Sequence, residues 1–296
     1  MTALMARARR RPRSSRLWPR VMVLSVVTAL VLLPFVWMTS LAFTPEGAAF
    51  SEVRLIPAQP TLENFATAMR VANLDTAFIN SAVVTSIAVL TNCVIPVLAG
   101  YAFAHLPFRG SKVVFYVLIS TAAIPVSVTL IPLFLMAKNF PLAGGNDLLG
   151  SGGSGLLDSL GGLMLPYLVG TMNIFLSRQY FAGMDRDFAE AARIDGASEF
   201  RIFSRIYLPM ARPLIALVAV FSFTGVWDDF LWPLVVSTSE RSTTVQLAIT
   251  TFASTGNVKY GALMAATILV SIPVLVVFLV NQRGFISGLS EGGLKG

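Results

Sequence analysis

Two neighbouring aspartates between tryptophans are the residues of this sequence best suited to binding chemistry. Asp228 and Asp229 lie in the run WDDFLWPL, between Trp227 and Trp232. Carboxylate oxygens accept hydrogen bonds from sugar hydroxyls, and aromatic rings cover the apolar face of a sugar ring. The same carboxylates could carry protons in an ion-coupled carrier, and tryptophans are also common where a helix leaves a membrane. These residues by themselves leave all three interpretations open.

A dense polar stretch, EAARIDGASEFRIFSRIYLP, is the second candidate site. It covers residues 190–209 and holds three acids and three arginines. Asp187 and Glu190 have the spacing of a capping box, which predicts a short helix that begins there. Gly196 would let the chain leave that helix in a left-handed conformation.

The rest of the stretch predicts a second short helix over residues 198–207, which Pro209 would end as the chain turns into the next segment. At helical spacing its aromatic and basic side chains fall on different faces: Phe200, Phe203 and Ile206 on one, Arg201 and Arg205 on the other. Two short helices that meet at a glycine suit the cleft of another protein. They would also suit the surface of a bilayer.

Signatures of nucleotide or metal chemistry are weak in this sequence. The run GGNDLLGSGGSG at residues 144–155 lacks the GK[ST] ending of a P-loop and is typical of a flexible linker. Cys93 is the only cysteine, and its apolar surroundings favour a packing role. We therefore predict no catalytic residue, no metal ligand and no cofactor bound by this chain.

The composition indicates that much of this chain lies in lipid. Its 296 residues are 55% hydrophobic and 12% charged, with a mean hydropathy of +0.73. Soluble domains carry about 25% charged residues, so the composition excludes a chain exposed to water over its whole surface. The basic N-terminus is predicted to meet anionic lipid headgroups rather than nucleic acid.

Six segments could cross a bilayer, for which a helix needs about 20 residues. The apolar run from Pro213 to Trp227 reaches this length only if its helix continues through Asp228 and Asp229 to about Val236, which would hold two acids at membrane depth. The other five predicted spans are residues 21–43, 76–104, 113–137, 159–177 and 260–282.

Basic residues indicate the orientation of these spans. If the N-terminus is cytoplasmic, most of the Lys and Arg residues fall in inner segments, including seven arginines before residue 21. The positive-inside rule then places both termini and the polar stretch in the cytoplasm. His105 would lie at the inner end of the second span and Asp228 toward the outer side, so this separation of acid and base disfavours a membrane hydrolase.

The polar stretch resembles the EAA loop of ABC transporter permeases, whose pattern is E-A-A, three residues, G, nine residues, then I-x-L-P. Every spacing is kept, and the matching residues are Glu190, Ala191, Ala192, Gly196, Ile206, Leu208 and Pro209. Other runs are similar to the MalG-like branch of binding-protein-dependent sugar importers: NSAVVTS at Asn80, GYAFAHLPF at Gly100, WDDFLWPL at Trp227 and the terminal GGLKG. The resemblance covers nearly the whole chain from the first span onward.

The resemblance implies an all-α polytopic membrane protein with six transmembrane helices, the type I ABC importer fold. It divides the chain into a basic cytoplasmic segment 1–20, a permease domain 21–282 with a cytoplasmic coupling loop at 185–209, and a cytoplasmic tail 283–296. Such a chain is a multi-pass permease subunit of the bacterial inner membrane and not an enzyme. It would move a sugar or related solute into the cytoplasm.

The resemblance also implies partners and sites. ATP and Mg would be bound by a separate ATPase dimer, and a second permease subunit and an extracytoplasmic solute-binding protein would complete the importer. The residues coupled to the ATPase would be Glu190, Ala191, Ala192, Asp195, Gly196, Arg201, Ile206, Leu208 and Pro209. The candidates for the solute path are Asn80, Trp227, Asp228, Asp229 and Trp232. The alternative function is a proton- or ion-coupled secondary transporter that uses the two aspartates.

Overall fold

The structure is a computed structural model, and it describes residues 17–48, 55–106, 108–254 and 258–293. The described residues form helices and connecting loops, without a strand. The helices are α1 Leu17–Ala42, α2 Glu63–Val71, α3 Leu74–His105, α4 Ser111–Thr121, α5 Val126–Lys138, α6 Leu160–Met164, α7 Thr171–Ala182, α8 Asp187–Ile194, α9 Glu199–Ile202, α10 Leu208–Met210, α11 Arg212–Trp227, α12 Leu231–Val236, α13 Val245–Ile249, α14 Thr251–Ser254 and α15 Tyr260–Gly293.

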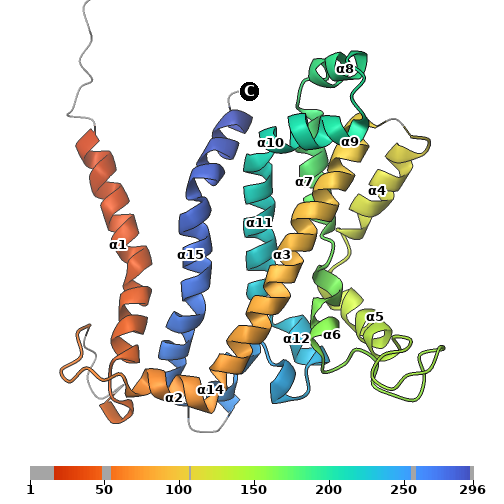
Figure 1. Cartoon of the computed structure of the whole chain (residues 1–296). Coiled ribbons are helices and arrows are strands. Elements are labelled where there is room, and N and C mark those ends of the chain that lie inside the picture. Colours follow the sequence, from red (N-terminus) through yellow and green to blue (C-terminus); the bar gives the residue numbers. More distant parts are fainter. Residues whose placement is uncertain (1–16, 49–54, 107, 255–257, 294–296) are drawn as a thin grey trace, which may run out of the picture.

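The long helices run side by side and define two ends of the molecule (Figure 1). The first turn of α1, the end of α15 and the α8–α9 segment lie at one end, which we call the loop side. Helices α2, α12 and α14 lie at the other end, the opposite side. Most of the predicted N-terminal segment 1–20 lies outside the described residues, whereas α15 continues through residue 293 into the predicted tail.

Four helical segments are each long and apolar enough to cross a membrane, and two bent pairs raise the number to as many as six. The four are Trp18–Ala42, Leu74–His105, Leu160–Ala182 and Tyr260–Gln282. They correspond to the first, second, fourth and sixth predicted spans. The segment Leu160–Ala182 is not one regular helix, because a 3₁₀ turn at Leu165–Tyr167 separates α6 from α7.

The third predicted span is not a single rod, which corrects the prediction of one continuous crossing by residues 113–137. It is the pair α4 and α5, bent by 99°. Pro125 lies at the start of α5 with extended backbone, at ψ 140°, and it has no N–H to continue the α4 hydrogen-bond ladder. The chain therefore turns a corner between the two helices.

The fifth predicted span was wrong in its outer half. Helix α11 ends at Trp227, and the chain is non-helical at Asp229 and Phe230 before α12 begins at Leu231. A carboxylate stabilises this break, because Asp229 Oδ1 accepts a hydrogen bond from the Leu231 backbone N–H at 2.9 Å. At the loop side, α11 is bent by 76° from the segment 199–210.

Helix α3 is the central element and packs on α7 and α11. A Cβ at Gly100 would lie 2.3 Å from Ser177 Cβ, so only glycine lets α3 and α7 approach this closely. Deeper in the bundle, the buried Asn92 amide bridges elements. Its Oδ1 accepts from Gly170 N at 2.7 Å and Asn173 Nδ2 at 2.9 Å. Polar side chains in a membrane bundle are costly unless paired, and these pairs join α3 to α7.

Candidate coupling and solute-path sites

The first arm of the polar stretch is α8, and it ends in a Schellman motif. Gly196 has φ +77°, the Gly196 N–H donates to Arg193 O at 3.0 Å, and the Ala197 N–H donates to Ala192 O at 2.9 Å. The predicted left-handed glycine is therefore confirmed. The predicted capping box is wrong, since α8 has no side-chain cap. Instead, Asp185 Oδ1 accepts from the Asp187 backbone N–H at 3.2 Å.

The second arm differs from the regular helix predicted for residues 198–207. It consists of α9, a π-helical turn at Phe203–Tyr207 and α10, so helical structure continues past Pro209 to Met210. The burial of the side chains in this arm also differs from the prediction. Ile202, Phe203 and Tyr207 are buried, whereas Phe200 is 74% exposed, so the predicted grouping of Phe200 with Phe203 on one face is wrong.

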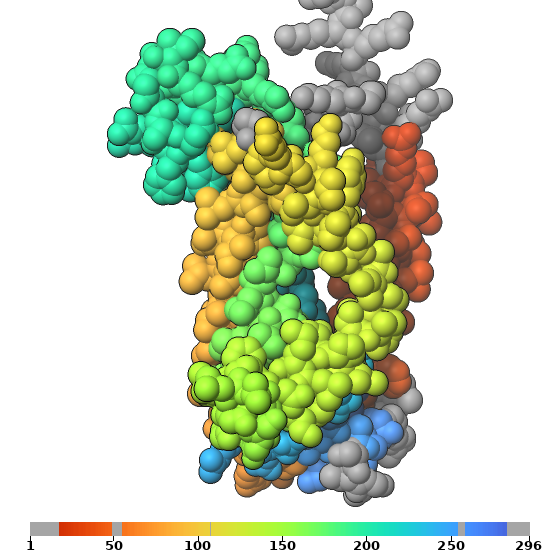
Figure 2. All heavy atoms as spheres, turned by 90° about the vertical axis from the view of Figure 1, so that its right-hand side faces the viewer, coloured from red at the N-terminus to blue at the C-terminus, as the bar shows by residue number. Residues whose placement is uncertain are grey.

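The tip where the arms meet is open to solvent and partly apolar. Ile194 is 87% exposed, and Figure 2 shows this whole segment projecting beyond the membrane helices. A Cβ at Gly196 would meet no atom of this chain within 4 Å. Of the residues matched to the EAA pattern or predicted to couple, the structure exposes Glu190, Ala191, Asp195, Gly196, Arg201 and Pro209 and partly buries Ala192, Ile206 and Leu208.

An aromatic cluster anchors the base of this segment to the bundle. Tyr207 is fully buried, and its hydroxyl donates to Asp185 O at 2.9 Å. Its ring centroid lies 5.3 Å from that of Tyr101 on α3 and 6.4 Å from that of Phe181 on α7. Force applied to the tip would therefore reach α3 and α7 through packed rings. The sequence analysis did not single out Tyr207, although a tyrosine among arginines beside the I-x-L-P run was the available signal.

A bidentate ion pair ties the two arms together. Arg193 Nε donates to Glu199 Oε1 at 2.6 Å, and Arg193 Nη2 donates to Glu199 Oε2 at 3.1 Å. Both side chains are about two-fifths exposed, at 39% and 43%, so solvent weakens the attraction. The paired geometry still fixes the angle between α8 and α9, because two parallel hydrogen bonds restrain both side chains.

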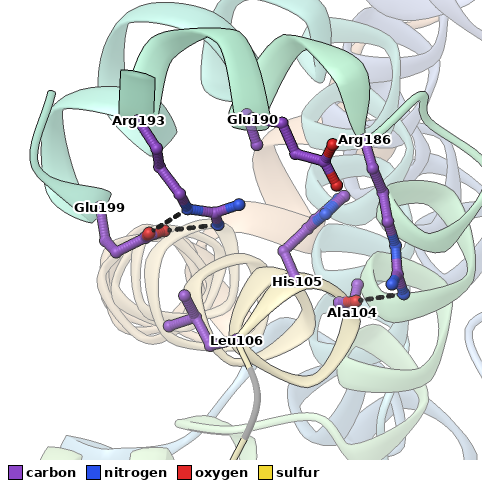
Figure 3. A pocket seen from close by; sticks show the side chains of 8 residues that line it. Ala104, His105, Leu106, Arg186, Glu190, Arg193 and Glu199 are labelled. Carbon is purple, nitrogen blue, oxygen red and sulfur yellow. Dashed lines mark hydrogen bonds and ion pairs between the residues drawn. The ribbon is translucent and has the colours of Figure 1, made fainter. Parts of the chain in front are cut away.

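A pocket of about 530 Å³ lies between α8 and the end of α3 (Figure 3). Its lining residues are Ala104, His105, Leu106, Arg186, Ala189, Glu190, Arg193 and Glu199. In Figure 3 the Glu190 carboxylate points into this pocket toward His105 and Arg186. Thus Glu190 contacts the space beneath the loop rather than the backbone at the start of α8.

Three of the five candidates for the solute path are buried: Trp227, Trp232 and Asn80. Trp227 is 3% exposed and donates to Val270 O at 3.0 Å, and Trp232 is 2% exposed and donates to Gly162 O at 3.0 Å. Asn80 is buried, and its amide donates to Arg241 O at 2.8 Å and Thr243 O at 2.9 Å. These three residues hold elements together in the described conformation and present no free face to a solute.

The two aspartates differ in environment. Asp228 is exposed, with its carboxylate 3.3 Å from Gln246 Nε2, whereas Asp229 is half-buried and accepts a hydrogen bond from the Tyr167 hydroxyl. The sequence analysis missed Tyr167, which the 3₁₀ turn before α7 brings to Asp229. An exposed carboxylate next to an amide can accept hydrogen bonds from a polyhydroxylated solute.

On the opposite side, one carboxylate accepts hydrogen bonds from a distant loop; we call this set of bonds the Asp158 latch, and the sequence analysis did not predict it. Asp158 Oδ1 accepts hydrogen bonds from Thr238 N at 3.0 Å, Ser239 N at 2.9 Å and Ser242 Oγ at 2.6 Å. Hydrogen bonds from the Ser242 and Ser239 residues lower the pKa of Asp158 to about 2. The latch joins the loop before α6 to the loop after α12.

A comparison with models of protein families identifies the family of this chain. Residues 94–289 match the model of the "Binding-protein-dependent transport system inner membrane component" family, which is more than half of the chain. This chain belongs to that family. It is therefore a membrane component of a binding-protein-dependent transport system, and the EAA-like tip, Glu190 to Gly196, falls within the matched region.

Relatives of known function extend the match over most of the chain. The diacetylchitobiose uptake system permease protein NgcG of Streptomyces coelicolor is 31% identical, over 90% of this chain and 85% of the relative. The trehalose/maltose transport system permease protein MalG of Thermococcus litoralis is 28% identical, over 92% and 94%.

A solved structure confirms the type of fold. A chain of a bacterial ABC transporter that imports the acidic polysaccharide alginate superposes with a TM-score of 0.76 at 22% identity, covering 93% of this chain and 99% of that chain. The permease thus has the fold of an ABC importer membrane subunit. A second alginate transporter structure, in complex with an alginate pentasaccharide-bound periplasmic protein, matches with a TM-score of 0.66 at 16% identity.

Proposed function

We propose that this permease is the transmembrane subunit of an ATP-driven ABC importer that moves an oligosaccharide or related solute into the cytoplasm. Family membership supports transport, and the relatives NgcG, AraQ and LacG are permease proteins of systems for diacetylchitobiose, arabinooligosaccharides and lactose. These systems share polyhydroxylated solutes. The chain itself would perform no covalent chemistry.

The coupling to ATP would run through the α8–α9 segment. The observation that carries this proposal is the exposed tip at Gly196 on a base that is buried at Tyr207. A segment that is exposed at its tip and packed into the bundle at its base can transmit the movement of a bound protein to the membrane helices. We propose that the tip docks in a cleft of a separate ATPase, which works as a dimer and binds the ATP and Mg.

The loop side would face the cytoplasm of a bacterium, with both chain termini on that side. Exposed arginines support this orientation, since Arg186, Arg193 and Arg205 lie on the loop-side segment. The opposite side, with the Asp158 latch and α12, would then meet the extracytoplasmic solute-binding protein. A second permease subunit would complete the pathway, and Asp228 and Asp229 would line this chain's part of it.

The test is uptake by the assembled transporter in proteoliposomes. The permease, its ATPase, its second permease and its binding protein are reconstituted, and uptake of labelled diacetylchitobiose, arabinooligosaccharide and maltose is followed with ATP inside. We expect uptake of at least one sugar that depends on ATP and on the ATPase. Uptake driven by a proton or ion gradient without the ATPase would overturn the proposal.

Orientation is tested separately in intact cells. A cysteine introduced by Ala191→Cys, in a Cys93→Ser background, should react with a membrane-permeant maleimide and not with an impermeant one. Cys93 is half-buried and is removed so that only the introduced thiol reports. Labelling by the impermeant reagent would place the coupling tip outside and reject ATPase docking.

A further inference from the structure

A second, smaller pocket lies at the loop-side ends of α3, α4 and α7, outside the coupling and solute-path sites. It encloses about 200 Å³ and shares two lining residues, Ala104 and Arg186, with the pocket beneath α8. Its lining residues are Phe103, Ala104, Ser111, Lys112, Phe115, Arg178, Ala182 and Arg186. Three of these eight side chains are cationic and none is acidic, so the pocket concentrates positive charge.

The three cations form no ion pair within the described part of the chain, although the Glu190 carboxylate points toward Arg186 from the neighbouring pocket (Figure 3). There, the ion pair in the structure joins Arg193 to Glu199, and none of the pocket cations takes part in it. Arg186 makes a long contact with a neutral acceptor, Ala104 O, at 3.4 Å. Like charges gathered in a partly buried site repel each other, and an anion would reverse the sign of that interaction.

Packing fixes the direction of the central arginine. The close approach of Gly100 and Ser177 sets the separation of α3 and α7 directly before Arg178. The Arg178 guanidinium carbon lies 4.2 Å from the centre of the buried Phe115 ring, and Phe175 stacks near that ring at 6.4 Å. Stacking on a ring leaves the N–H groups at the guanidinium edge free to donate to oxygen atoms.

The surface next to the pocket is apolar along α4. This helix lies on the outside of the bundle in Figure 2, and four of its large hydrophobic side chains are exposed in this chain: Val113, Val114, Tyr116 and Val117. A cationic pocket at the end of a span, continued by an apolar strip along the span, matches a molecule with an anionic head and a hydrocarbon tail. Free phosphate has no hydrocarbon tail, so it could occupy the pocket but would not cover the exposed apolar side chains of α4.

We propose that this pocket binds the phosphate headgroup of an anionic phospholipid, with an acyl chain lying along α4. Lys112 and Arg186 would neutralise the phosphate charge, and Arg178 would supply paired N–H donors. Basic pockets between membrane helices are suited to anionic headgroups, while a zwitterionic lipid adds a positive choline to a site that is already positive. The proposal does not depend on which solute is transported.

The test measures lipid retention by the purified full-length chain. The protein is extracted from membranes that contain phosphatidylglycerol and phosphatidylcholine, and bound lipid is counted by native mass spectrometry. We expect selective retention of phosphatidylglycerol by the wild type and at least a tenfold loss in the double variant Lys112→Gln with Arg178→Gln. Arg109→Gln is the matched control, because Arg109 is exposed in the same connection and does not line the pocket.

Three additional measurements distinguish a lipid site from a misfolded variant and from a site for a soluble anion. Arg178→Lys keeps the charge and should restore part of the retention, and circular dichroism checks that each variant is folded. Equal retention by the double variant and the control would overturn the proposal. Displacement of the lipid by millimolar inorganic phosphate would also overturn it, because the pocket would then be a site for a soluble anion.

Discussion

Substitution of Gly196 can separate the shape of the coupling tip from its role as a contact surface. The residue has φ +77°, and a Cβ placed there meets no atom of this chain within 4 Å. Non-glycine residues in this conformation cost roughly 1–2 kcal/mol. Alanine and tryptophan carry the same Cβ, so Gly196→Ala and Gly196→Trp should destabilise the free permease by about the same amount.

The two variants should differ only when the ATPase is bound. A tryptophan side chain at the tip would have to fit into the docking cleft, and overpacking costs about 1–3 kcal/mol. Because about 1.4 kcal/mol corresponds to a factor of ten in affinity, we expect Gly196→Trp to weaken ATPase binding by roughly 5-fold to 140-fold relative to Gly196→Ala.

The assay compares melting temperature in detergent with co-purification of the co-expressed ATPase. Gly196→Asn serves as a further control, since asparagine tolerates the left-handed region and should retain the most stability and binding. Equal melting temperatures for the alanine and tryptophan variants with unequal ATPase recovery would support docking at this position. Equal recovery of the ATPase would refute it, because the tip would then have space around it in the complex.

Three further outcomes are expected. Tyr207→Phe removes the hydrogen bond to Asp185 O and should lower the free energy of unfolding by about 1 kcal/mol, measured by thermal unfolding. Tyr207→Ala also removes the ring from the aromatic cluster and should lower it by about 3–5 kcal/mol. Equal losses of stability would show that the ring does not anchor the loop. Arg193→Gln should lower stability by no more than about 1 kcal/mol but reduce the coupling of ATP hydrolysis to uptake, measured in proteoliposomes with Arg205→Gln as the exposed control. Asp158 contributes stability that is present above its unfolded pKa of about 4 and is lost as the pH falls through its folded pKa of about 2. Between pH 4 and pH 2, the melting temperature of the wild type should therefore fall more than the melting temperature of Asp158→Asn. Parallel pH curves for those two proteins would contradict the latch.

Local patterns in the sequence predicted the backbone at the end of α8 but not its start. The glycine after EAARID required a backbone conformation that few other residues adopt, and the Schellman motif confirms it. The second arm could not be predicted from periodicity, because the π-helical turn at Phe203–Tyr207 inserts an extra residue per turn. Phe200, three residues before the buried Phe203, is exposed although ideal spacing places both on one face, whereas Tyr207 is buried four residues after Phe203, as that spacing allows.

Hydropathy was enough to predict the spans that are long apolar helices. It failed for the third and fifth predicted spans, where the helix is interrupted. Pro125 was visible in the sequence, but prolines are often tolerated in membrane helices, so the residue type alone does not distinguish a kinked helix from the 99° break that the structure shows. Similarly, a continuous helix through Asp228 satisfied the length of a span, whereas the structure ends that helix at Trp227. The Asp158 latch joins residues about 80 positions apart, and a single sequence carries no signal for such a contact.

The corner between α4 and α5 limits the surroundings in which this chain can be stable. Helix α4 has 11 residues and rises about 16 Å, roughly half the thickness of a hydrocarbon layer, so the corner falls near the middle of the bilayer. Residues 121–126 are exposed there in the single chain, and the N–H groups of residues 122–124 donate to the last carbonyls of α4. The first N–H groups of α5 have no partner in their own helix, and hydrocarbon offers them none. We therefore expect water or a neighbouring polypeptide to accept hydrogen bonds from the first turn of α5, even where lipid covers α4.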